Sequence, residues 1–191
     1  VLTVGSGATE IIASEPVLYG IAWSPDGSRI AYNGGARDDL EVFVIGADAM
    51  LVRGNSRVEI SGTAGALVAA GARIVTGALL SVFAPGQPKV LRTGTATIGI
   101  RGTGVYIESE PDRTYVCTCY GEAELAASDD PAAREIVNTE HHEQPRYIMA
   151  KGAPQMLMRA PVINHTDAEL TLLESLHGRR PPFADTDQPR Y

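Results

Sequence analysis

Short β-branched segments separated by glycine-containing turns recur from Val17 to Leu125. They follow one another at a spacing of roughly 8 to 12 residues, which is typical of many brief strands joined by tight turns. Helical periodicity is absent from this region. We therefore expect a mostly β fold, a β-sandwich or a β-solenoid-like domain, rather than a parallel sheet with crossover helices.

The expected strands extend over the first two thirds of the chain. Pro25 and Gly27 favour a tight turn that joins the first two of them in a hairpin. The expected ranges are Val17 to Trp23, Arg29 to Tyr32, Leu40 to Ile45, Ala49 to Arg53, Arg57 to Ser61, Ala66 to Ala69, Arg73 to Thr76, Ser81 to Ala84, Lys89 to Arg92, Ala96 to Ile100, Gly104 to Glu108, Thr114 to Tyr120 and Glu122 to Ala126.

The C-terminal third has a different character. A polar loop over 128–133 indicates the clearest domain boundary. We therefore expect N-terminal strands over 1–47, a β domain over 48–127 and an extension over 128–191. In the extension, Thr166 and Glu169 form a capping-box pattern ahead of several leucines, which predicts a short helix over about 166–177. Gly178 ends this helix, and the residues from Ala184 onward are expected to form an extended tail.

Charge and hydropathy exclude some partners. The 191-residue chain has a formal net charge of −7 and a pI near 5.1, which opposes binding to phosphate backbones, so no nucleic-acid partner is expected. Its apolar runs are far shorter than the roughly 20 residues of a membrane-spanning helix, so no membrane span is expected. The start at Val1 suggests an exported protein with its leader removed, located in the periplasm or outside the cell.

The sequence carries none of the common catalytic motifs. It has no G-x-S-x-G turn around a nucleophilic serine, no phosphate-binding loop and no His-Glu-x-x-His zinc motif. We therefore predict that the protein is not an enzyme.

Two cysteines and three histidines are the candidate metal ligands. Cys117 and Cys119 lie two apart in an expected strand, so both project from one face of it. His141 and His142 follow closely enough to return alongside them, but adjacent residues of a strand point to opposite faces, so at most one is expected to join both cysteines. With His165, the candidate set is Cys117, Cys119, one of the two adjacent histidines, and His165.

Three interpretations of this cluster stay open. The cysteines can be small buried residues beside a polar His-His loop. They can form a disulfide, although two same-face positions on one strand would strain it. Thiolate and imidazole ligands together also suit zinc, copper or haem iron.

One segment resembles a known signature. The run L-R-T-G-T-A-T-I-G-I-R-G-T-G-V, from Leu91 to Val105, resembles the "R-T-P-x-A-x-x-G-x-R-G-T" pattern of FecR-type domains, with Gly94 in the place of proline. Flanking strands extend the resemblance to about Asp48 to Ala126. The residues that carry the motif are Arg92, Thr93, Gly99, Arg101, Gly102 and Thr103.

This resemblance implies an extracytoplasmic β-rich module that takes part in signalling or protein contact and has no catalytic residues to carry over. The glycines around Arg101 suit a sharp turn, and we expect Arg101 to have a structural role, docked against a neighbouring layer. The Cys-x-Cys and His-His pairs are additions to the family pattern.

Three functions follow from these observations. The first is a binding or assembly module in envelope signalling or structure, with an envelope protein or a second copy of the chain as partner. The second is a metal- or haem-binding carrier or electron-transfer protein. The third is a self-assembling filament subunit, in which the segment from Leu2 to Ile12 pairs with a neighbouring subunit.

Overall fold

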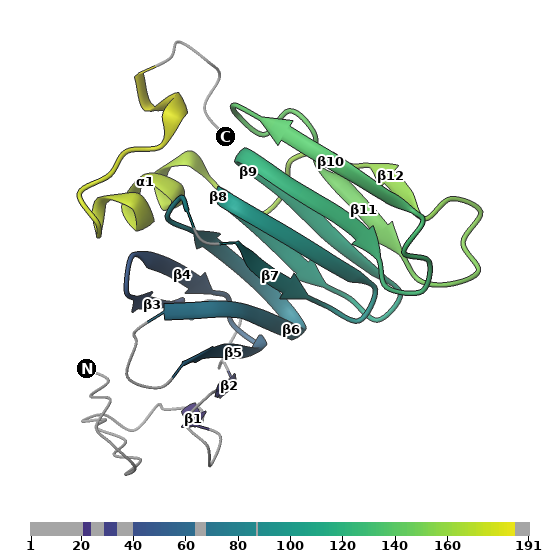
Figure 1. Ribbon diagram of the computed structural model, residues 1–191, viewed down its shortest axis with the longest axis horizontal. Coiled ribbons are helices and arrows are strands. Elements are labelled where there is room, and N and C mark those ends of the chain that lie inside the picture. The colour runs from purple at the N-terminus through teal and green to yellow at the C-terminus, as the bar shows by residue number, and fades with distance from the viewer. Residues whose placement is uncertain (1–20, 24–28, 34–39, 64–67, 87, 186–191) are drawn as a thin grey trace.

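The computed structural model describes residues 21–23, 29–33, 40–63, 68–86 and 88–185 (Figure 1). The expectation of a mostly β protein with one short C-terminal helix is confirmed. The elements are β1 (Ile21–Trp23), β2 (Arg29–Asn33), β3 (Glu41–Ile45), β4 (Asp48–Val52), β5 (Arg57–Thr63), β6 (Val68–Val82), β7 (Lys89–Arg92), β8 (Ala96–Ser109), β9 (Arg113–Ala127), β10 (Arg134–Thr139), β11 (Arg146–Met149), β12 (Leu157–Arg159), α1 (Asp167–Ser175) and the 3-10 turn η1 (Pro182–Asp185).

Hydrogen bonds join the twelve strands of the described residues into a single mixed sheet that is not closed. Its central order is β1-β2-β5-β6-β7-β8-β9-β11-β12, with β10 beside β9 and the β3–β4 hairpin beside β6. The pairing of β6 with β7 is parallel, and the other recorded pairings are antiparallel. The predicted hairpin of β1 and β2 is confirmed, although its turn lies outside the described residues.

Three strands are longer than the sequence pattern indicates. β6, β8 and β9 each join two or three of the expected short strands into one strand of 14 or 15 residues. Glycines at the expected breaks, among them Gly102 with φ 65° and Gly121 with φ 85°, bend the strand without ending its pairing. Both lie where the register of β8 and β9 shifts by a bulge, which increases the local twist.

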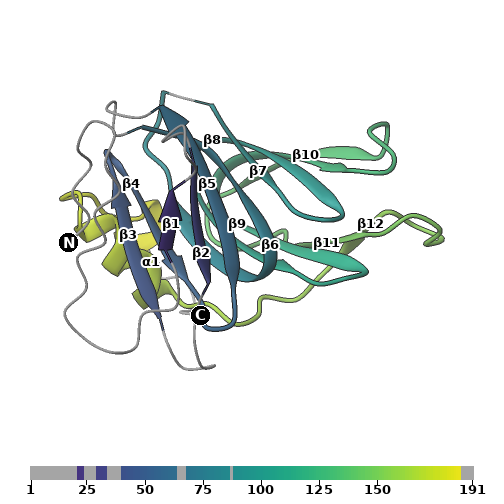
Figure 2. The same ribbon diagram turned by 90° about the horizontal axis from the view of Figure 1, so that it is seen from below.

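The bulge divides the sheet into two halves that share the long strands. The first half-sheet consists of β10, the C-terminal half of β9, the N-terminal half of β8, β7, the N-terminal half of β6, β5, β2 and β1. The second half-sheet consists of β3, β4, the C-terminal halves of β6 and β8, the N-terminal half of β9, β11 and β12. Figure 2 shows β7 and β10 in one layer and β11 and β12 in the other.

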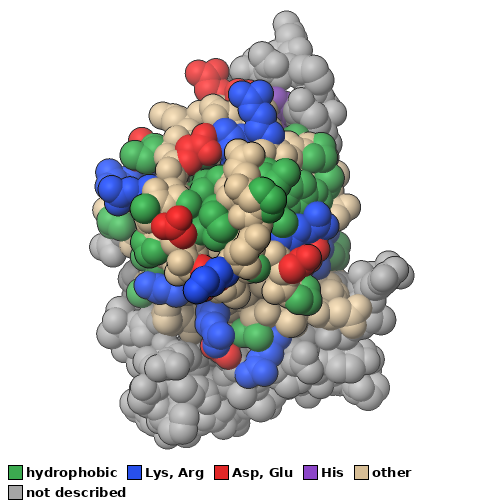
Figure 3. Space-filling model, turned by 90° about the vertical axis from the view of Figure 1, so that its right-hand side faces the viewer, with side chains coloured by type: hydrophobic (Ala, Val, Ile, Leu, Met, Phe, Trp, Pro, Cys, Tyr) green, Lys and Arg blue, Asp and Glu red, His purple; other side chains and the backbone are tan. Residues whose placement is uncertain are grey.

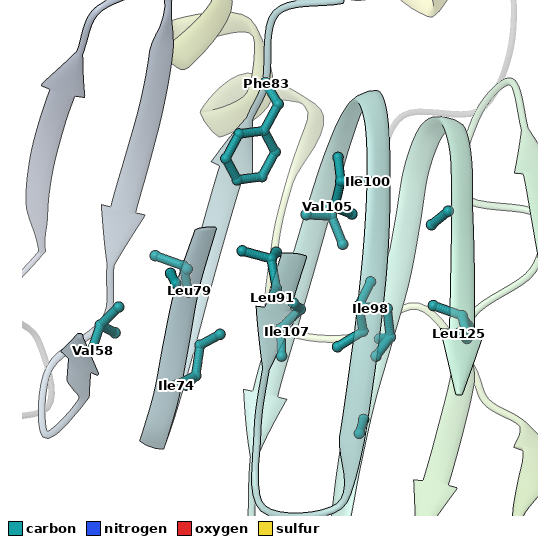
Figure 4. Packing of buried hydrophobic residues seen from close by; sticks show 14 of the residues in the cluster. Val58, Ile74, Leu79, Phe83, Leu91, Ile98, Ile100, Val105, Ile107 and Leu125 are labelled. Carbon is teal, nitrogen blue, oxygen red and sulfur yellow. The ribbon is translucent and has the colours of Figure 1, made fainter. Parts of the chain in front are cut away.

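The main core lies between these halves. Ile98 and Ile100 precede the bulge, Val105 and Ile107 follow it, and all four belong to one buried cluster (Figure 4). Because side chains alternate along a strand, the extra residues of the bulge are needed to keep both halves of β8 facing the same interior.

A second apolar cluster covers the other face of the second half-sheet. Leu170 and Leu173 of α1, together with Phe183 of η1, pack onto it from outside. The sheet side of this cluster consists of Ala49, Leu51, Ala78, Leu80, Val82, Tyr106, Tyr115, Cys117, Cys119 and Tyr120. This second cluster contains the two cysteines.

The capping box of α1 is confirmed. The side chain of Thr166 accepts a hydrogen bond from the backbone of Glu169, and the Glu169 carboxylate accepts one from the Thr166 backbone at 2.9 Å. The helix ends at Ser175, and Gly178 follows with φ 64°. The tail was expected to be extended from Ala184 onward, but Ala184 and Asp185 belong to the 3-10 turn η1.

Residues after 128 contribute more to the sheet than expected. β10 and β11 both pair with β9, and β12 pairs with β11, so the region from Arg134 to Arg159 is continuous with the β domain. The three strands have only 3 to 6 residues each, which is too short for a clear alternation in the sequence. The segment Leu2 to Ile12 lies outside the described residues, so its proposed pairing with another subunit stays a prediction.

Within the FecR-like motif, the expected structural role of Arg101 is wrong. The Arg101 side chain is 74% exposed and lies 3.9 Å from Glu122, so it does not dock against a neighbouring layer. Arg92, at the end of β7, is also exposed. The small residues carry the structural role, since the Thr103 hydroxyl donates to the Glu122 carbonyl oxygen at 2.9 Å.

The remaining motif residues support the turns of the first half-sheet. The buried Thr93 hydroxyl accepts a hydrogen bond from the Ala96 backbone at 2.9 Å and lies 2.6 Å from the Thr114 hydroxyl. Gly99 pairs with Glu124 across β8 and β9. Gly102 lies so close to Pro85 that an added Cβ would come within 2.8 Å of it.

Within the described residues, no helix has the length and apolar character needed to cross a bilayer.

Candidate metal centre

Four metal-ligating side chains meet beneath α1. Their ligand atoms, two cysteine sulfurs and one ring nitrogen from each of two histidines, all lie within 4.8 Å of one another. The residues are Cys117, Cys119, His142 and His165, and each is at most 5% exposed. They correspond to the set expected from the sequence, with His142 as the member of the adjacent pair.

β9 provides both sulfurs. Val116 faces the main core, whereas Cys117 and Cys119 face the second cluster, as the two-residue period of a strand requires. Both thiols are free in the structure, so the disulfide interpretation has no support from the geometry.

The loop after β10 provides His142. This residue adopts the left-handed conformation, φ 61°, and its backbone N–H donates to the Cys119 carbonyl oxygen at 3.0 Å. The loop thus returns alongside β9 and brings the ring nitrogen Nδ1 to 3.3 Å from the Cys117 sulfur.

The segment that leads into α1 provides His165, the residue before the helix cap. Its Nδ1–H donates to the Ile163 carbonyl oxygen at 2.6 Å, which directs Nε2 into the cluster. The ring stacks on Tyr106, with centroids 4.6 Å apart. These two contacts determine the orientation of the ring.

The hydrogen bonds determine which nitrogens carry protons. His142 Nε2 lies 3.1 Å from the Asp167 carboxylate, and His165 Nδ1 faces a carbonyl oxygen, so each of these nitrogens is the donor. In the neutral rings, the lone pairs then lie on His142 Nδ1 and His165 Nε2, which are only 3.1 Å apart. Two lone pairs directed at each other repel, and either a proton on one ring or a cation shared between the rings relieves this repulsion.

Asp167 supports the cluster from outside. Its carboxylate oxygen Oδ1 accepts hydrogen bonds from Nε2 of both His141 (3.0 Å) and His142 (3.1 Å). Carboxylates that hold the outer nitrogen of a ligating histidine are a regular feature of metal sites. His141 is not among the four side chains around the sulfurs, but His141, His142 and Asp167 form a second buried group whose ligand atoms lie within 4.8 Å of one another. The His141 ring also stacks on Phe183.

The electrostatics of this ligand set favour a cation. Burial alone raises the pKa of the Cys117 thiol, but hydrogen bonds with Cys119, His142 and His165 bring that pKa well below its ordinary value. Burial and the neighbouring Cys117 raise the pKa of Cys119 well above it. Burial lowers the pKa of His142, but Cys117 and Asp167 outweigh this and raise it. Negative charge thus accumulates on the Cys117 sulfur, opposite a proton on His142 that a bound cation would displace.

The geometry matches a small four-coordinate ion. Zn–S bonds of about 2.3 Å and Zn–N bonds of about 2.0–2.1 Å place tetrahedral ligands roughly 3.3–3.8 Å apart. The S–N distance of 3.3 Å and the N–N distance of 3.1 Å are near this range. Copper(I) also accepts thiolate and imidazole. Haem does not fit, because iron in a porphyrin takes only axial protein ligands, and four ligands this close leave no space for the macrocycle.

No protein-family model matches the sequence, and no curated protein matches it. Two solved structures of a "putative anti-sigma factor" from Parabacteroides distasonis are similar in fold, with TM-scores of 0.53 and 0.52 and sequence identities of 10% and 11%. Each match covers 79% of this chain, which spans 65% of the other. The fold is shared with these structures. At such low identity the likeness extends to the fold alone.

The arrangement in space also resembles the catalytic triad of a thiol hydrolase, with Cys117, His142 and Asp167 in a row. The sulfur faces one ring nitrogen, and the carboxylate holds the other, as in enzymes that activate a cysteine nucleophile. However, the Cys117 side chain is 0% exposed, so a substrate cannot approach the sulfur in this conformation. Cys119 and His165 converge on the same point, which a triad does not require and a metal site does.

The sequence indicated these four candidate ligands, together with His141, but not the supporting role of Asp167. Its signal was available, since Asp167 is the first residue of α1, two positions after His165. A carboxylate close to a candidate histidine ligand is a natural partner for the outer nitrogen of a ligating ring.

Proposed function

We propose that this protein is a non-enzymatic, extracytoplasmic binding module that carries one buried transition-metal ion. The observation that carries the proposal is the convergence of two sulfurs and two imidazole nitrogens within 4.8 Å in a buried site. All four ligand positions of a tetrahedral ion are supplied by the chain. This favours a structural metal over a catalytic one, which keeps a position open for water or substrate.

A role in envelope signalling is supported by fold and sequence together. The fold is similar to the Parabacteroides distasonis structures, and the motif from Arg92 to Thr103 resembles FecR-type domains. A protein partner, in the periplasm or outside the cell, agrees with both resemblances. The net charge of −7 continues to argue against nucleic acid.

The sheet offers apolar side chains for such a partner. In the described part of the chain, β3 pairs only with β4, and its Val42 and Val44 are 43% and 52% exposed. Figure 3 views the end of the molecule near β10, β11 and β12, where further hydrophobic side chains gather among scattered charged ones. Open strand edges with apolar side chains favour pairing with another chain.

Elemental analysis tests the metal part of the proposal. The wild-type protein, purified without chelator, should contain one zinc or copper ion per chain, and Cys117→Ser should lose it. His177→Gln is the matched control, because His177 lies beyond α1 and outside the cluster. A metal-free wild-type protein whose two thiols react with iodoacetamide in the folded state would contradict the proposal.

Light scattering tests the open edge. If a second copy pairs with β3, the apparent mass should increase with concentration, and Val44→Lys should abolish the increase, because a charged side chain on an edge strand opposes pairing. A wild-type protein that remains monomeric at high concentration would exclude a second copy as the partner and would leave a different envelope protein. Leu172→Lys, at an exposed position of α1 rather than of β3, serves as the control for added charge.

A further inference from the structure

We infer that a four-coordinate Zn²⁺ ion in this site fastens the C-terminal segment, residues 160–185, onto the sheet, and that loss of the ion uncovers the apolar face beneath it. This inference rests on the proposed metal binding and adds to it the identity of the ion and the segment that the ion controls.

The ligands come from two parts of the molecule. Cys117 and Cys119 belong to β9, and His142 is tied to β9 by its backbone hydrogen bond to Cys119. His165 alone belongs to the C-terminal segment. An ion bound by all four therefore cross-links this segment to the sheet, as a disulfide would.

The outer contacts of the site reinforce this cross-link. Asp167, the first residue of α1, accepts hydrogen bonds from His141 and His142 of the loop. Metal binding requires His142 to keep Nδ1 inward and hence Nε2 toward Asp167. One ion thus stabilises two connections between the loop and the segment, through His165 and through Asp167.

Apart from the apolar contacts of Leu170, Leu173 and Phe183, the segment is held by a buried hydrogen bond from the Tyr120 hydroxyl to the Glu174 carboxylate and by ion pairs that are partly exposed. Arg53 pairs with Glu169, and Arg179 pairs with Glu174 and donates to the Ala47 carbonyl oxygen at 2.8 Å. Partly exposed ion pairs of this kind contribute little to stability. α1 itself has nine residues, fewer than the roughly 12–15 that an isolated helix needs in water, so its helical structure depends on docking.

The face beneath the segment is apolar. Leu170 and Leu173 are 0% exposed, and they cover the sheet residues of the second cluster, among them Leu80 and Tyr106. If the segment leaves, this face and both thiols become accessible to solvent. A module that binds proteins would then present a different surface with and without the ion.

Zinc fits this role better than copper. Zn²⁺ is redox-inert and forms closed tetrahedral sites with two cysteines and two histidines, and these sites contribute directly to folding. With two thiolates and two neutral imidazoles, the bound Zn²⁺ is formally neutral, which suits a site without solvent. An electron-transfer role would place a redox-active ion here instead.

Hydrogen exchange on the full chain tests the inference. In the zinc-loaded wild-type protein, the amides of α1 should be protected from exchange. Removal of zinc by a chelator should increase their exchange rates at least about tenfold, and the exchange rates of β8 and β9 should increase by less. Zinc restores protection. Exchange of α1 that is unchanged after verified loss of the ion would overturn the inference while leaving metal binding intact.

Variants separate the ion from the apolar contacts. His165→Gln should reproduce the exchange of the chelated protein in α1 even with zinc present, whereas His177→Gln should not. Leu173→Ala should keep α1 protected with zinc but lose protection at lower chelator concentrations than the wild type, and Leu172→Ala, at a 51% exposed position of the same helix, should behave as the wild type.

The identity of the ion has its own readout. Co²⁺ in place of Zn²⁺ should give the intense visible absorption of a tetrahedral thiolate site, and titration with Zn²⁺ should remove it at one equivalent. A purified protein that holds copper, or a cobalt spectrum of six-coordinate type, would overturn the assignment to zinc. A wild-type protein without any ion would contradict the proposed function itself.

Discussion

Removal of the metal ion should lower the melting temperature of the wild-type protein by about 8–16 °C. An ion present at a thousand times its dissociation constant stabilises the folded state by about 4 kcal/mol, and each kcal/mol corresponds to about 2–4 °C in a domain of 150–250 residues. The effect is large because the four candidate ligands are buried and their ligand atoms lie within 4.8 Å of one another. Thermal unfolding with and without chelator measures the shift.

A ligand variant controls for other actions of the chelator. Cys119→Ala should melt at about the temperature of the chelated wild type, and the chelator should change it no further. Alanine is suitable because Cys119 is fully buried in the second apolar cluster, so no polar group is left behind. A variant that still responds to the chelator, or a wild type that does not, would contradict the prediction.

Lys89→Met should destabilise the protein by about 3–5 kcal/mol, the cost of leaving one partner of a buried ion pair uncompensated. The Lys89 ammonium lies 3.0 Å from the Asp48 carboxylate, with side chains only 4% and 5% exposed. The other Asp48 oxygen accepts the Ala84 backbone N–H at 3.0 Å. Chemical denaturation gives the free energy of unfolding.

A double variant isolates the uncompensated charge. Asp48→Asn combined with Lys89→Met should be less destabilising than Lys89→Met alone, because asparagine can still accept the Ala84 hydrogen bond without a buried charge. Arg101→Ala is the matched surface control, since this arginine is 74% exposed, and it should change the free energy of unfolding by less than about 0.5 kcal/mol. A loss below about 1 kcal/mol for Lys89→Met would show that water reaches the pair.

Local sequence patterns were sufficient to predict most strands, the helix and the shared face of the two cysteines. The glycine-punctuated β-branched runs located most strands up to β9, and the pair Thr166 and Glu169 located α1, because strand periodicity and helix caps depend on residues only a few positions apart. The same argument placed Cys117 and Cys119 on one face of one strand. It did not describe the adjacent histidines correctly, because they lie in a bend after β10 rather than in a strand, and Nε2 of both rings reaches Asp167.

Distant contacts decided the rest. The pattern around Arg101 suggested a break and a docked side chain, but the pairing of β8 with β9 continues through a bulge and leaves the arginine in solvent. β10 and β11 are strands because β9 offers an edge to pair with, and β12 pairs in turn with β11, which their own short sequences do not reveal.

The candidate metal centre shows the same division. The sequence by itself determined the ligand types and the shared face of the two cysteines. Only the tertiary structure decided that His142 turns inward, that His165 arrives from a segment 46 positions after Cys119, and that Asp167 holds the histidines from outside. The physical reason is that ligand chemistry belongs to individual residues, whereas the distances between ligands depend on how the loop and the C-terminal segment fold back onto the sheet.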